Sequence, residues 1–476
     1  MIDQMTVDAP VRARRAGLVL AVCCLGQLTV ILDASIVNVA VPSIQTALNF
    51  TPGGLAWVFD GYLIPFAGFL LFAGRMVDLF GGRRVLLIGL AVFTLFSLIG
   101  GIAPNAATLV LGRAGQGFGG AIIASAVLAV LSSTFTEPME RAKAFALWGA
   151  ASGSGGAIGV LSGGAITEWT SWRWTLLVNV PLGLLIAGMA IVSVAGPREG
   201  VKRDEIKLDW LGALSVTLGI AALVYGLAEG QRYGWGSTRI VGSLTIGVVL
   251  LAVFVLDQAK LAKQPLMELS LFRNRSVWAG NLTMLAFGGA LPATFLFLTL
   301  LYQQVLGYSA IQAGLAFLPL TICAFIGAAV SSGAAPRFGA RRMMLIGLLP
   351  MIAGLLWQMV ADENASYVSD LLGPSMLFGV GLGLVVTSVA GAATAGVPED
   401  KHGLASGVLN TAQALGGAAW LAIMVAVAQA RTADVAGNGP ADLHAYVSGY
   451  GAAFLATALL LAAGLAAAAA VPREVR

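Results

Sequence analysis

Long apolar runs separated by short polar stretches follow one another along the whole chain. Each run is about twenty residues long, the length that an α-helix needs to cross the hydrocarbon core of a bilayer, whereas barrel strands would alternate over about ten residues. Only helices and closed barrels satisfy every backbone polar group in lipid. The pattern therefore predicts an all-α polytopic membrane protein with fourteen spans. These spans are expected at residues 16–42, 53–73, 84–103, 107–133, 142–164, 174–196, 210–228, 240–259, 277–301, 312–333, 342–361, 371–395, 404–428 and 448–471.

The basic residues test this number of spans, because cytosolic loops carry an excess of Lys and Arg. With the N-terminus in the cytosol, inner segments receive 22 of the 27 basic residues and outer segments receive four, while Arg113 stays within the membrane. Adding or removing one span would reverse the side of every later loop and destroy this bias. We therefore expect a multi-pass protein of the cytoplasmic membrane with both termini in the cytosol.

Two parts of the chain repeat each other. The stretch Phe80–Arg84 after the second span matches Phe338–Arg342 after the tenth, and Glu137–Arg141 after the fourth span matches Val397–Lys401 after the twelfth. Paired repeats are a transporter plan in which the substrate binds between the copies, near the middle of the membrane.

The repeat predicts two six-helix bundles, residues 1–196 and 277–476, with two inserted spans and their cytosolic linkers at 197–276. The copies differ where chemistry would lie: Asp78 corresponds to Pro336 and Arg113 to Gly373. The charges within the membrane belong to the first copy, so we assign ion handling to that bundle.

Composition supports lipid as the solvent and excludes several classes of function. Hydrophobic residues make up 58% of the chain and charged residues only 11%, where a soluble domain carries about 25% charge. The net charge of +4 follows the topology and does not indicate nucleic-acid binding. No Lys follows a Gly, which excludes a Walker A nucleotide site, and the three cysteines are too scattered for a metal site. We expect no metal, cofactor, nucleotide or nucleic acid, and no enzymatic activity.

Three ionisable residues lie well inside the predicted spans, away from their ends. At 1.5 Å of rise per residue, Asp33, Asp60 and Arg113 all lie roughly 10–15 Å below the outer face, in spans 1, 2 and 4. Each would cost about 2.5–3.5 kcal/mol or more if it faced lipid, so these side chains must face a cavity or one another. One interpretation is a structural ion pair between Asp33 and Arg113. This ion pair would leave Asp60 without a partner, and ionisable groups in a membrane are functional by default. Proton coupling through these three residues is the other interpretation, and we favour it.

Four stretches, in order along nearly the whole chain, resemble motifs of the major facilitator superfamily and specifically of its fourteen-span drug:proton antiporter family. They are Leu32–Pro42 in span 1, Gly74–Arg84 between spans 2 and 3, Leu111–Gly117 in span 4, and the glycine-rich part of span 5 with Ser171–Trp174 and Asn179–Pro181. Two positions depart from the family pattern. Val160 stands where the span 5 motif usually has proline, and Asp60 stands where many members have a neutral residue; members with an acid there resemble exporters of organic cations.

The resemblance gives two further sets of residues a role. It implies a conformational latch at the cytosolic end of the bundles, whose residues are Gly74, Asp78, Gly81, Arg83 and Arg84. A purely topological role for these arginines stays open. It also implies an antiporter motif at Gly155, Gly159, Gly163 and Gly164. Small residues at every fourth position also allow close packing of helices, which in this family is taken to limit proton leak.

Polar and aromatic residues inside the spans are candidates for binding a substrate. Pockets for amphiphilic ligands are mostly apolar with a few polar groups, and the candidates are Asp33, Asp60, Asn38, Tyr62, Gln116, Tyr302, Gln304, Asn410 and Gln413. We therefore expect a monomeric, proton-coupled antiporter that exports amphiphilic, cationic drugs or antibiotics and whose partners are the drug, protons and membrane lipids. Two alternatives stay open: an exporter dedicated to one endogenous metabolite or antibiotic, and a membrane sensor that does not transport.

Overall fold

The computed structural model describes residues 3–51, 54–194, 208–262, 265–394, 397, 402–437 and 439–472. The regular secondary structure of these residues is helical throughout, and fourteen helices or runs of helices are long and apolar enough to cross a membrane. The predicted all-α fold with fourteen spans is confirmed. The elements are α1 (Asp3–Ile36), η1 (Asn38–Ala40), α2 (Val41–Leu48), η2 (Gly54–Ala56), α3 (Trp57–Phe80), α4 (Gly82–Gly101), α5 (Ala106–Thr134), α6 (Pro138–Trp169), α7 (Arg173–Leu177), α8 (Asn179–Ser193), α9 (Trp210–Tyr233), α10 (Thr238–Leu256), η4 (Asp257–Leu261), η5 (Leu269–Arg273), α11 (Arg275–Leu300), η6 (Leu301–Val305), α12 (Ala310–Ala316), α13 (Leu318–Phe338), α14 (Ala340–Gln358), η7 (Tyr367–Leu371), α15 (Leu372–Thr394), α16 (His402–Ala436) and α17 (Leu443–Ala470).

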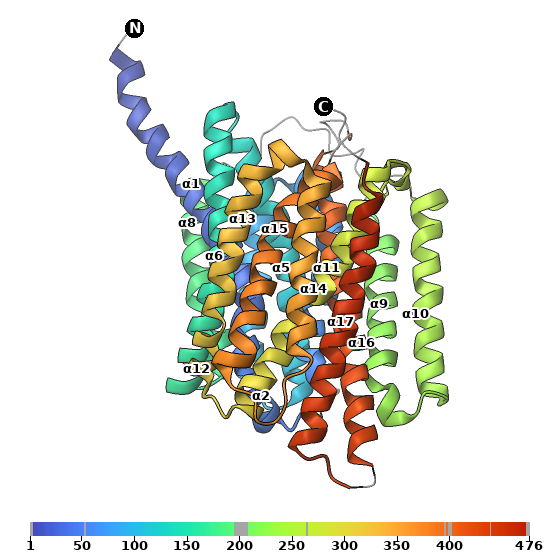
Figure 1. Cartoon of the computed structure of the whole chain (residues 1–476). Helices are drawn as coiled ribbons and strands as arrows, with labels where there is room; N and C mark the ends of the chain where they lie inside the picture. Colours follow the sequence, from blue (N-terminus) through green and yellow to red (C-terminus); the bar gives the residue numbers. More distant parts are fainter. Residues whose placement is uncertain are drawn as a thin grey trace.

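The spans run side by side, and α1 begins at the same end of the molecule at which α17 ends (Figure 1). We call this end the terminal face. The short helices α2 and α12 lie at the opposite end, which we call the distal face. A chain that crosses an even number of times must begin and end on the same side, as this one does.

The same helix pairs pack in both halves of the chain. In the first half α3 and α4 pack on α5, and α1 packs on α6 and α8; in the second half α13 and α14 pack on α15, and α11 packs on α16 and α17. The turns that follow α3 and α13 also match, because Gly81 and Gly339 both have φ of 82°, a left-handed conformation that favours glycine. The two six-helix bundles are therefore present; the domain limits at 196 and 277 remain predictions.

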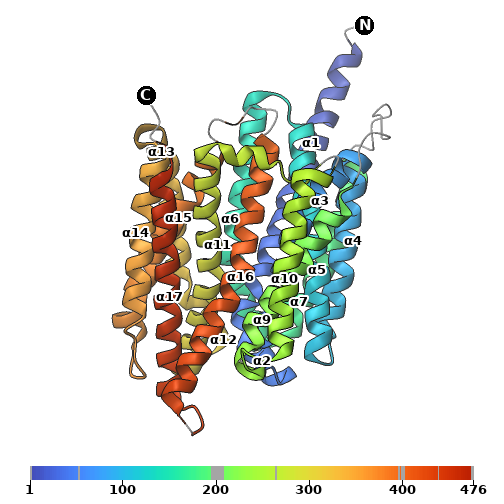
Figure 2. The same ribbon diagram turned by 90° about the vertical axis from the view of Figure 1, so that its right-hand side faces the viewer.

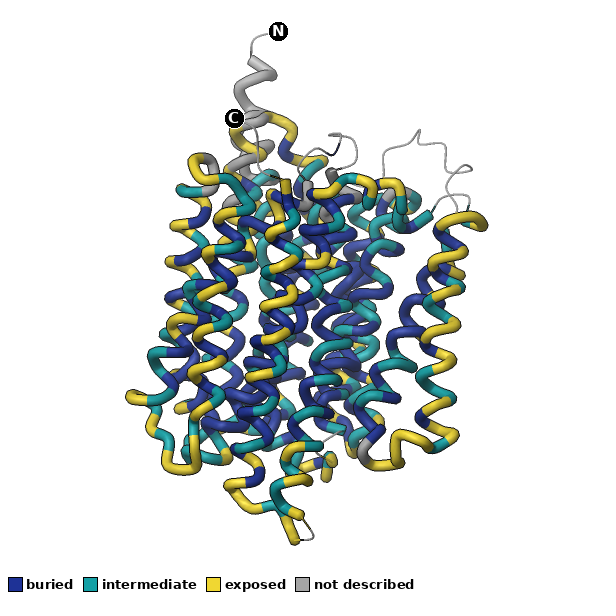
Figure 3. The backbone as a smooth tube through the Cα atoms, turned by 45° about the vertical axis from the view of Figure 1, so that its right-hand side comes forward, coloured by how far each residue is buried: buried dark blue, intermediate teal, exposed yellow. Residues whose placement is uncertain are grey.

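The inserted helices lie outside both bundles, on one side of the molecule (Figures 1 and 2). Helix α9 packs on α3 of the first bundle and on α16 of the second, and α10 packs on α9. A cluster of buried apolar side chains joins these helices and includes Ile64, Ile220, Phe254 and Ala418. Helix α10 turns an exposed apolar face outward (Figure 3), as expected for a surface whose solvent is lipid.

The two bundles contact each other near the distal face. Gln303 Nε2 donates to the carbonyl of Val39 at 2.8 Å, and the backbone N–H of Ile311 donates to Glu168 Oε2 at 3.0 Å. Helix α12 also packs against α6 there. These contacts connect the distal ends of spans 1 and 5 with the second bundle.

Candidate functional site

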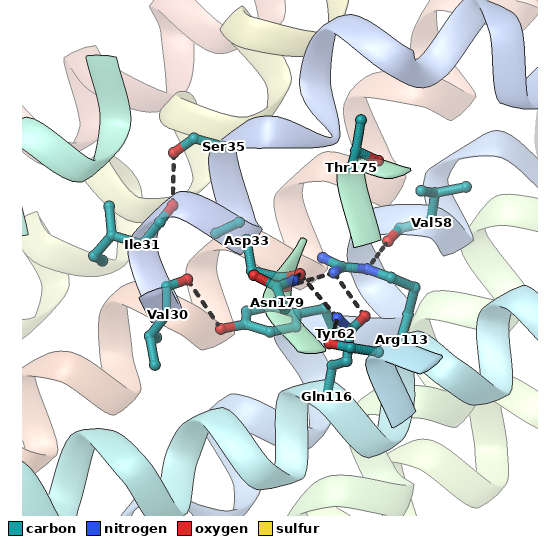
Figure 4. A network of polar contacts seen from close by, with 12 residues as sticks. Val30, Ile31, Asp33, Ser35, Val58, Tyr62, Arg113, Gln116, Thr175 and Asn179 are labelled. Carbon is teal, nitrogen blue, oxygen red and sulfur yellow. Dashed lines mark hydrogen bonds and ion pairs between the residues drawn. The ribbon is translucent and has the colours of Figure 1, made fainter. Parts of the chain in front are cut away.

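Asp33 lies in the last third of α1 and is completely buried. Its Oδ2 accepts a hydrogen bond from Arg113 Nη1 of α5 at 2.6 Å, and the two side chains form an ion pair (Figure 4). Helix geometry predicts both residues at the same depth, and the structure brings them into direct contact. Because both groups are almost fully shielded from solvent, each is a costly charge without the other.

Two amides complete the surroundings of Asp33. Its Oδ1 accepts from Gln116 Nε2 at 2.8 Å and from Asn179 Nδ2 at 2.7 Å. Gln116 is held at both ends: Nε2 also contacts Ser97 Oγ at 2.6 Å, and Oε1 accepts from Arg113 Nη1 at 3.0 Å. The carboxylate therefore accepts hydrogen bonds from three donors on two other spans.

The guanidinium of Arg113 is fixed by α3 as well as by Asp33. Its Nε donates to the carbonyl of Val58 at 3.0 Å, and the ring of Tyr62 lies 4.6 Å from its Cζ. Helices α3 and α5 approach closely here, since a Cβ on Gly117 would overlap the carbonyl oxygen of Tyr62. The glycine of the span 4 motif thus permits the contact between helices that holds Arg113.

Asp60 has different surroundings, although it lies on the same turn of α3 as Tyr62. It is completely buried, and neither carboxylate oxygen has a hydrogen-bond partner among the described residues. A Cβ on the next residue, Gly61, would lie 3.3 Å from the Cβ of Arg113, yet the Arg113 guanidinium bonds Asp33 and Val58 instead. The structure therefore places the three ionisable residues in one region and pairs only two of them. A buried, unpaired carboxylate is costly when ionised.

The candidate substrate residues fall into two groups. Tyr62 and Gln116 belong to the Asp33 network described above. The others lie apart from it: Asn38 donates back to the carbonyl of Ser35 on its own span, Tyr302 is buried in the second bundle against Ser375, and Gln304 is exposed at the distal face. Asn410 is exposed and Gln413 is half-buried, both on α16. Their role in substrate binding stays a prediction.

The residues assigned to the latch lie at the terminal face, at the junction of α3 and α4. Arg83 Nη2 donates to the carbonyl of Ile191 near the end of α8 at 2.6 Å, so this arginine connects two spans of its own bundle. Gly74 lies in α3 and Gly81 forms the left-handed turn, while Arg84 is exposed. The side chain of Asp78 lies outside the described residues. The latch remains a prediction.

The glycine row of α6 lies against α1. A Cβ on Gly159 would lie 2.7 Å from Ser35 Cβ, and one on Gly163 would overlap the carbonyl oxygen of Ile36. A Cβ on Gly155 would lie 3.1 Å from the side chain of Ile31, while Gly164 faces a backbone oxygen of α12 in the second bundle. Close packing is therefore the observed property of the row, and it positions the part of α1 that carries Asp33.

Asn179 and Ser97 were not assigned to the site from the sequence. Asn179 is the first residue of α8, directly after the interruption that separates α8 from α7. Pro181 explains this interruption, because a proline lacks the N–H that would bond the carbonyl of Leu177. The stretch Asn179–Pro181 resembles part of a family motif, but spacing along the chain does not reveal that the Asn179 amide reaches Asp33.

Comparison with known proteins identifies the family. The model of the Major Facilitator Superfamily matches residues 23–421. The cephamycin export protein CmcT of Amycolatopsis lactamdurans is 39% identical over 93% of this chain and 90% of its own length. The puromycin resistance protein pur8 of Streptomyces alboniger is 37% identical over 98% of this chain and 93% of its own. The chain belongs to the Major Facilitator Superfamily, and it is a membrane transporter and not an enzyme.

Solved structures show the same fold at low sequence identity. A bacterial homolog of the human lysosomal transporter Spinster aligns with a TM-score of 0.62 and 17% identity, covering 96% of this chain and 98% of that one. A mutant of the nucleoside transporter NupG aligns with a TM-score of 0.66 and 13% identity, covering 96% of this chain and all (100%) of that one.

Proposed function

We propose that this protein is a proton-coupled antiporter that exports amphiphilic, cationic drugs or antibiotics across the cytoplasmic membrane. In this proposal both termini are cytosolic, one copy of the chain suffices, and substrate moves outward while protons move inward. The observation that carries the proposal is the buried carboxylate of Asp33, held by Arg113 and two amides within the membrane-spanning part of the first bundle. Ionisable groups at this depth mark ion pathways.

Proton and substrate would compete for the same negative charge. Neutralising Asp33 with a proton would release Arg113 from its ion pair and change what holds α1 against α5. Asp60 adds a second carboxyl group with no partner of its own among the described residues. A proton or a cationic substrate would each remove the cost of that charge, which is the requirement for exchange of one against the other.

The remaining candidate residues have supporting roles in the proposal. The glycine row of α6 would keep water from passing beside Asp33, since it brings the α6 backbone against α1. The latch at the terminal face would be formed by Gly74, Asp78, Gly81, Arg83 and Arg84. The candidate polar residues of the second bundle, including those of α16, would contact substrate as the bundles move.

The names of the relatives support export of antibiotics or drugs, because they include a cephamycin export protein and a puromycin resistance protein. These names also favour the second candidate function, an exporter dedicated to one antibiotic. The relatives that they describe come from Amycolatopsis and Streptomyces, and each is named for a single compound.

A drug panel separates the two candidates. The chain is expressed in a host that lacks its own efflux pumps, and resistance is measured for cationic, neutral and anionic drugs with and without a protonophore. Broad resistance to cationic drugs that the protonophore abolishes is the expected result. Resistance to one compound alone would favour the dedicated exporter. Accumulation that is indifferent to the protonophore would rule out proton coupling.

A further inference from the structure

In all of the hydrogen bonds described for its carboxylate, Asp33 is the acceptor and the partner is the donor. Arg113 Nη1 donates to Oδ2, and the amide nitrogens of Gln116 and Asn179 donate to Oδ1. An ionised carboxylate only accepts hydrogen bonds, whereas a protonated carboxyl group must also donate one. If Asp33 takes up a proton without other change, its new O–H group faces donors only. At least one partner must therefore turn from donor to acceptor.

The three partners differ in their ability to make this change. A guanidinium has no acceptor atom, so Arg113 cannot do so. The amide of Gln116 is fixed at both ends, because Oε1 accepts from Arg113 and Nε2 also donates to Ser97. Turning it would place its NH2 group against the Arg113 donor and break that contact, although the Ser97 hydroxyl could then donate instead of accept. The amide of Asn179 makes one hydrogen bond, to Asp33, and its buried Oδ1 has no partner within the described part of the chain. Half a turn of this amide exchanges the donor for the acceptor and breaks nothing else.

We propose that Asn179 is the positioning residue that responds to protonation of Asp33: its amide donates to the carboxylate and, after half a turn, accepts the O–H of the carboxylic acid. This inference rests on the proposed function, in which Asp33 carries the proton. It assigns Asn179 a role that Gln116, bonded to the same oxygen, cannot fulfil.

The other groups around Asp33 leave this role to Asn179. Helix α5 contributes Arg113, and α3 contributes Tyr62, whose hydroxyl donates to the carbonyl of Val30 and not to Asp33. Helices α6, α7 and α8 also pack on α1, and among their described residues none with a charged side chain bonds to Asp33. Since Asn179 begins α8 at the break in span 6, turning its amide also changes a contact between span 1 and span 6.

Infrared difference spectroscopy on the purified, reconstituted protein tests the proposal directly. A step from alkaline to acidic pH should produce a carboxylic-acid C=O band that is absent in Asp33→Asn. In protein labelled with ¹³C at the asparagine side-chain carbonyl, the same step should move one amide band to lower wavenumber, because that carbonyl starts to accept a hydrogen bond. The shift should vanish in the near-isosteric Asn179→Leu. It should persist in Thr175→Val, a buried control on α7 whose hydroxyl bonds only its own segment.

The outcomes are distinct. An Asp33 band accompanied by the asparagine shift supports the proposal. An Asp33 band without any asparagine shift in the labelled wild-type protein overturns it and leaves proton coupling intact, and this measurement needs no variant at Asn179. Absence of the Asp33 band would remove the proposed function itself. As a second readout, Asn179→Ser, whose hydroxyl can also donate or accept, should retain more pH-dependent efflux than Asn179→Leu; equal loss in both would count against the switch.

Discussion

Asp33 and Asp60 are two buried carboxylates on different helices of one bundle, and their surroundings are opposite. Asp33 has three donors, one of them charged, while Asp60 has no hydrogen-bond partner among the described residues. Removing one member of a buried ion pair costs about 3–5 kcal/mol, because the other charge remains without compensation. Removing an unpaired buried charge has no such penalty. The two positions should therefore respond differently to the same substitution.

We expect Asp33→Asn to abolish proton-driven efflux and to lower stability by about 3–5 kcal/mol, since it leaves Arg113 as a buried, uncompensated charge. The double variant Asp33→Asn with Arg113→Gln should recover part of that stability without recovering efflux. Thermal unfolding of the detergent-solubilised protein and efflux from matched amounts in membranes check this. Stability that is equally low in both variants would show that the ion pair does not dominate the effect.

For Asp60→Asn we expect unchanged or slightly raised stability, together with a change in substrate preference. A second carboxylate attracts cations, and dications most strongly, through the low dielectric of the protein interior. Resistance to dicationic drugs should fall much more than resistance to monocations, and neutral drugs should be nearly unaffected. Resistance profiles at matched expression measure this. Parallel loss across the three charge classes would mean that Asp60 supports packing and does not select charge.

Among the contacts between helices, the glycine row of α6 is the one that positions the segment of α1 carrying Asp33. We expect Gly163→Ala to cost about 1–3 kcal/mol, as overpacking does, and to reduce efflux, because its Cβ would overlap the carbonyl oxygen of Ile36. Gly156→Ala on the same helix is the matched control, since its Cβ would meet only Ser35 Oγ, at 3.9 Å. Alanine favours a helix over glycine by about 1 kcal/mol, so the control should be neutral or stabilising. Equal effects at both positions would contradict a role for close packing.

The sequence predicted the helices well where their length is set by the bilayer, and less well where a span is interrupted. Span 1 continues through η1 into α2, and span 6 is divided into α7 and α8. Runs of apolar residues do not reveal such interruptions, although Pro181 is a local cause of one of them. Depth along each helix placed Asp33 and Arg113 in one layer and gave their ion pair as one of two interpretations. It could not predict that Asn179 joins them, because this depends on the path of the chain through the break.

The topology of the whole molecule can be tested with single cysteines in a cysteine-free background. We expect cysteines at Asn49 and Asp434 to react with an impermeant thiol reagent added outside intact cells, because both residues are exposed at the distal ends of their helices. A cysteine at Lys143, near the start of α6 at the terminal face, should react only after the cells are opened. Labelling of Lys143→Cys from outside would contradict cytosolic termini.

The position of α9 has a consequence for how the molecule meets the bilayer. Two similar bundles have two equivalent lateral seams between them, one between α3 and α16 and the other between α6 and the helix pair α12 and α13. Helix α9 lies over the first seam, where it packs on both α3 and α16, and the second seam lies on the other side of the molecule from α9 and α10 (Figure 1). The duplicated architecture is thus made one-sided by an insertion. A hydrophobic molecule dissolved in the membrane would reach the boundary between the bundles without meeting the inserted helices only beside α6 and α13.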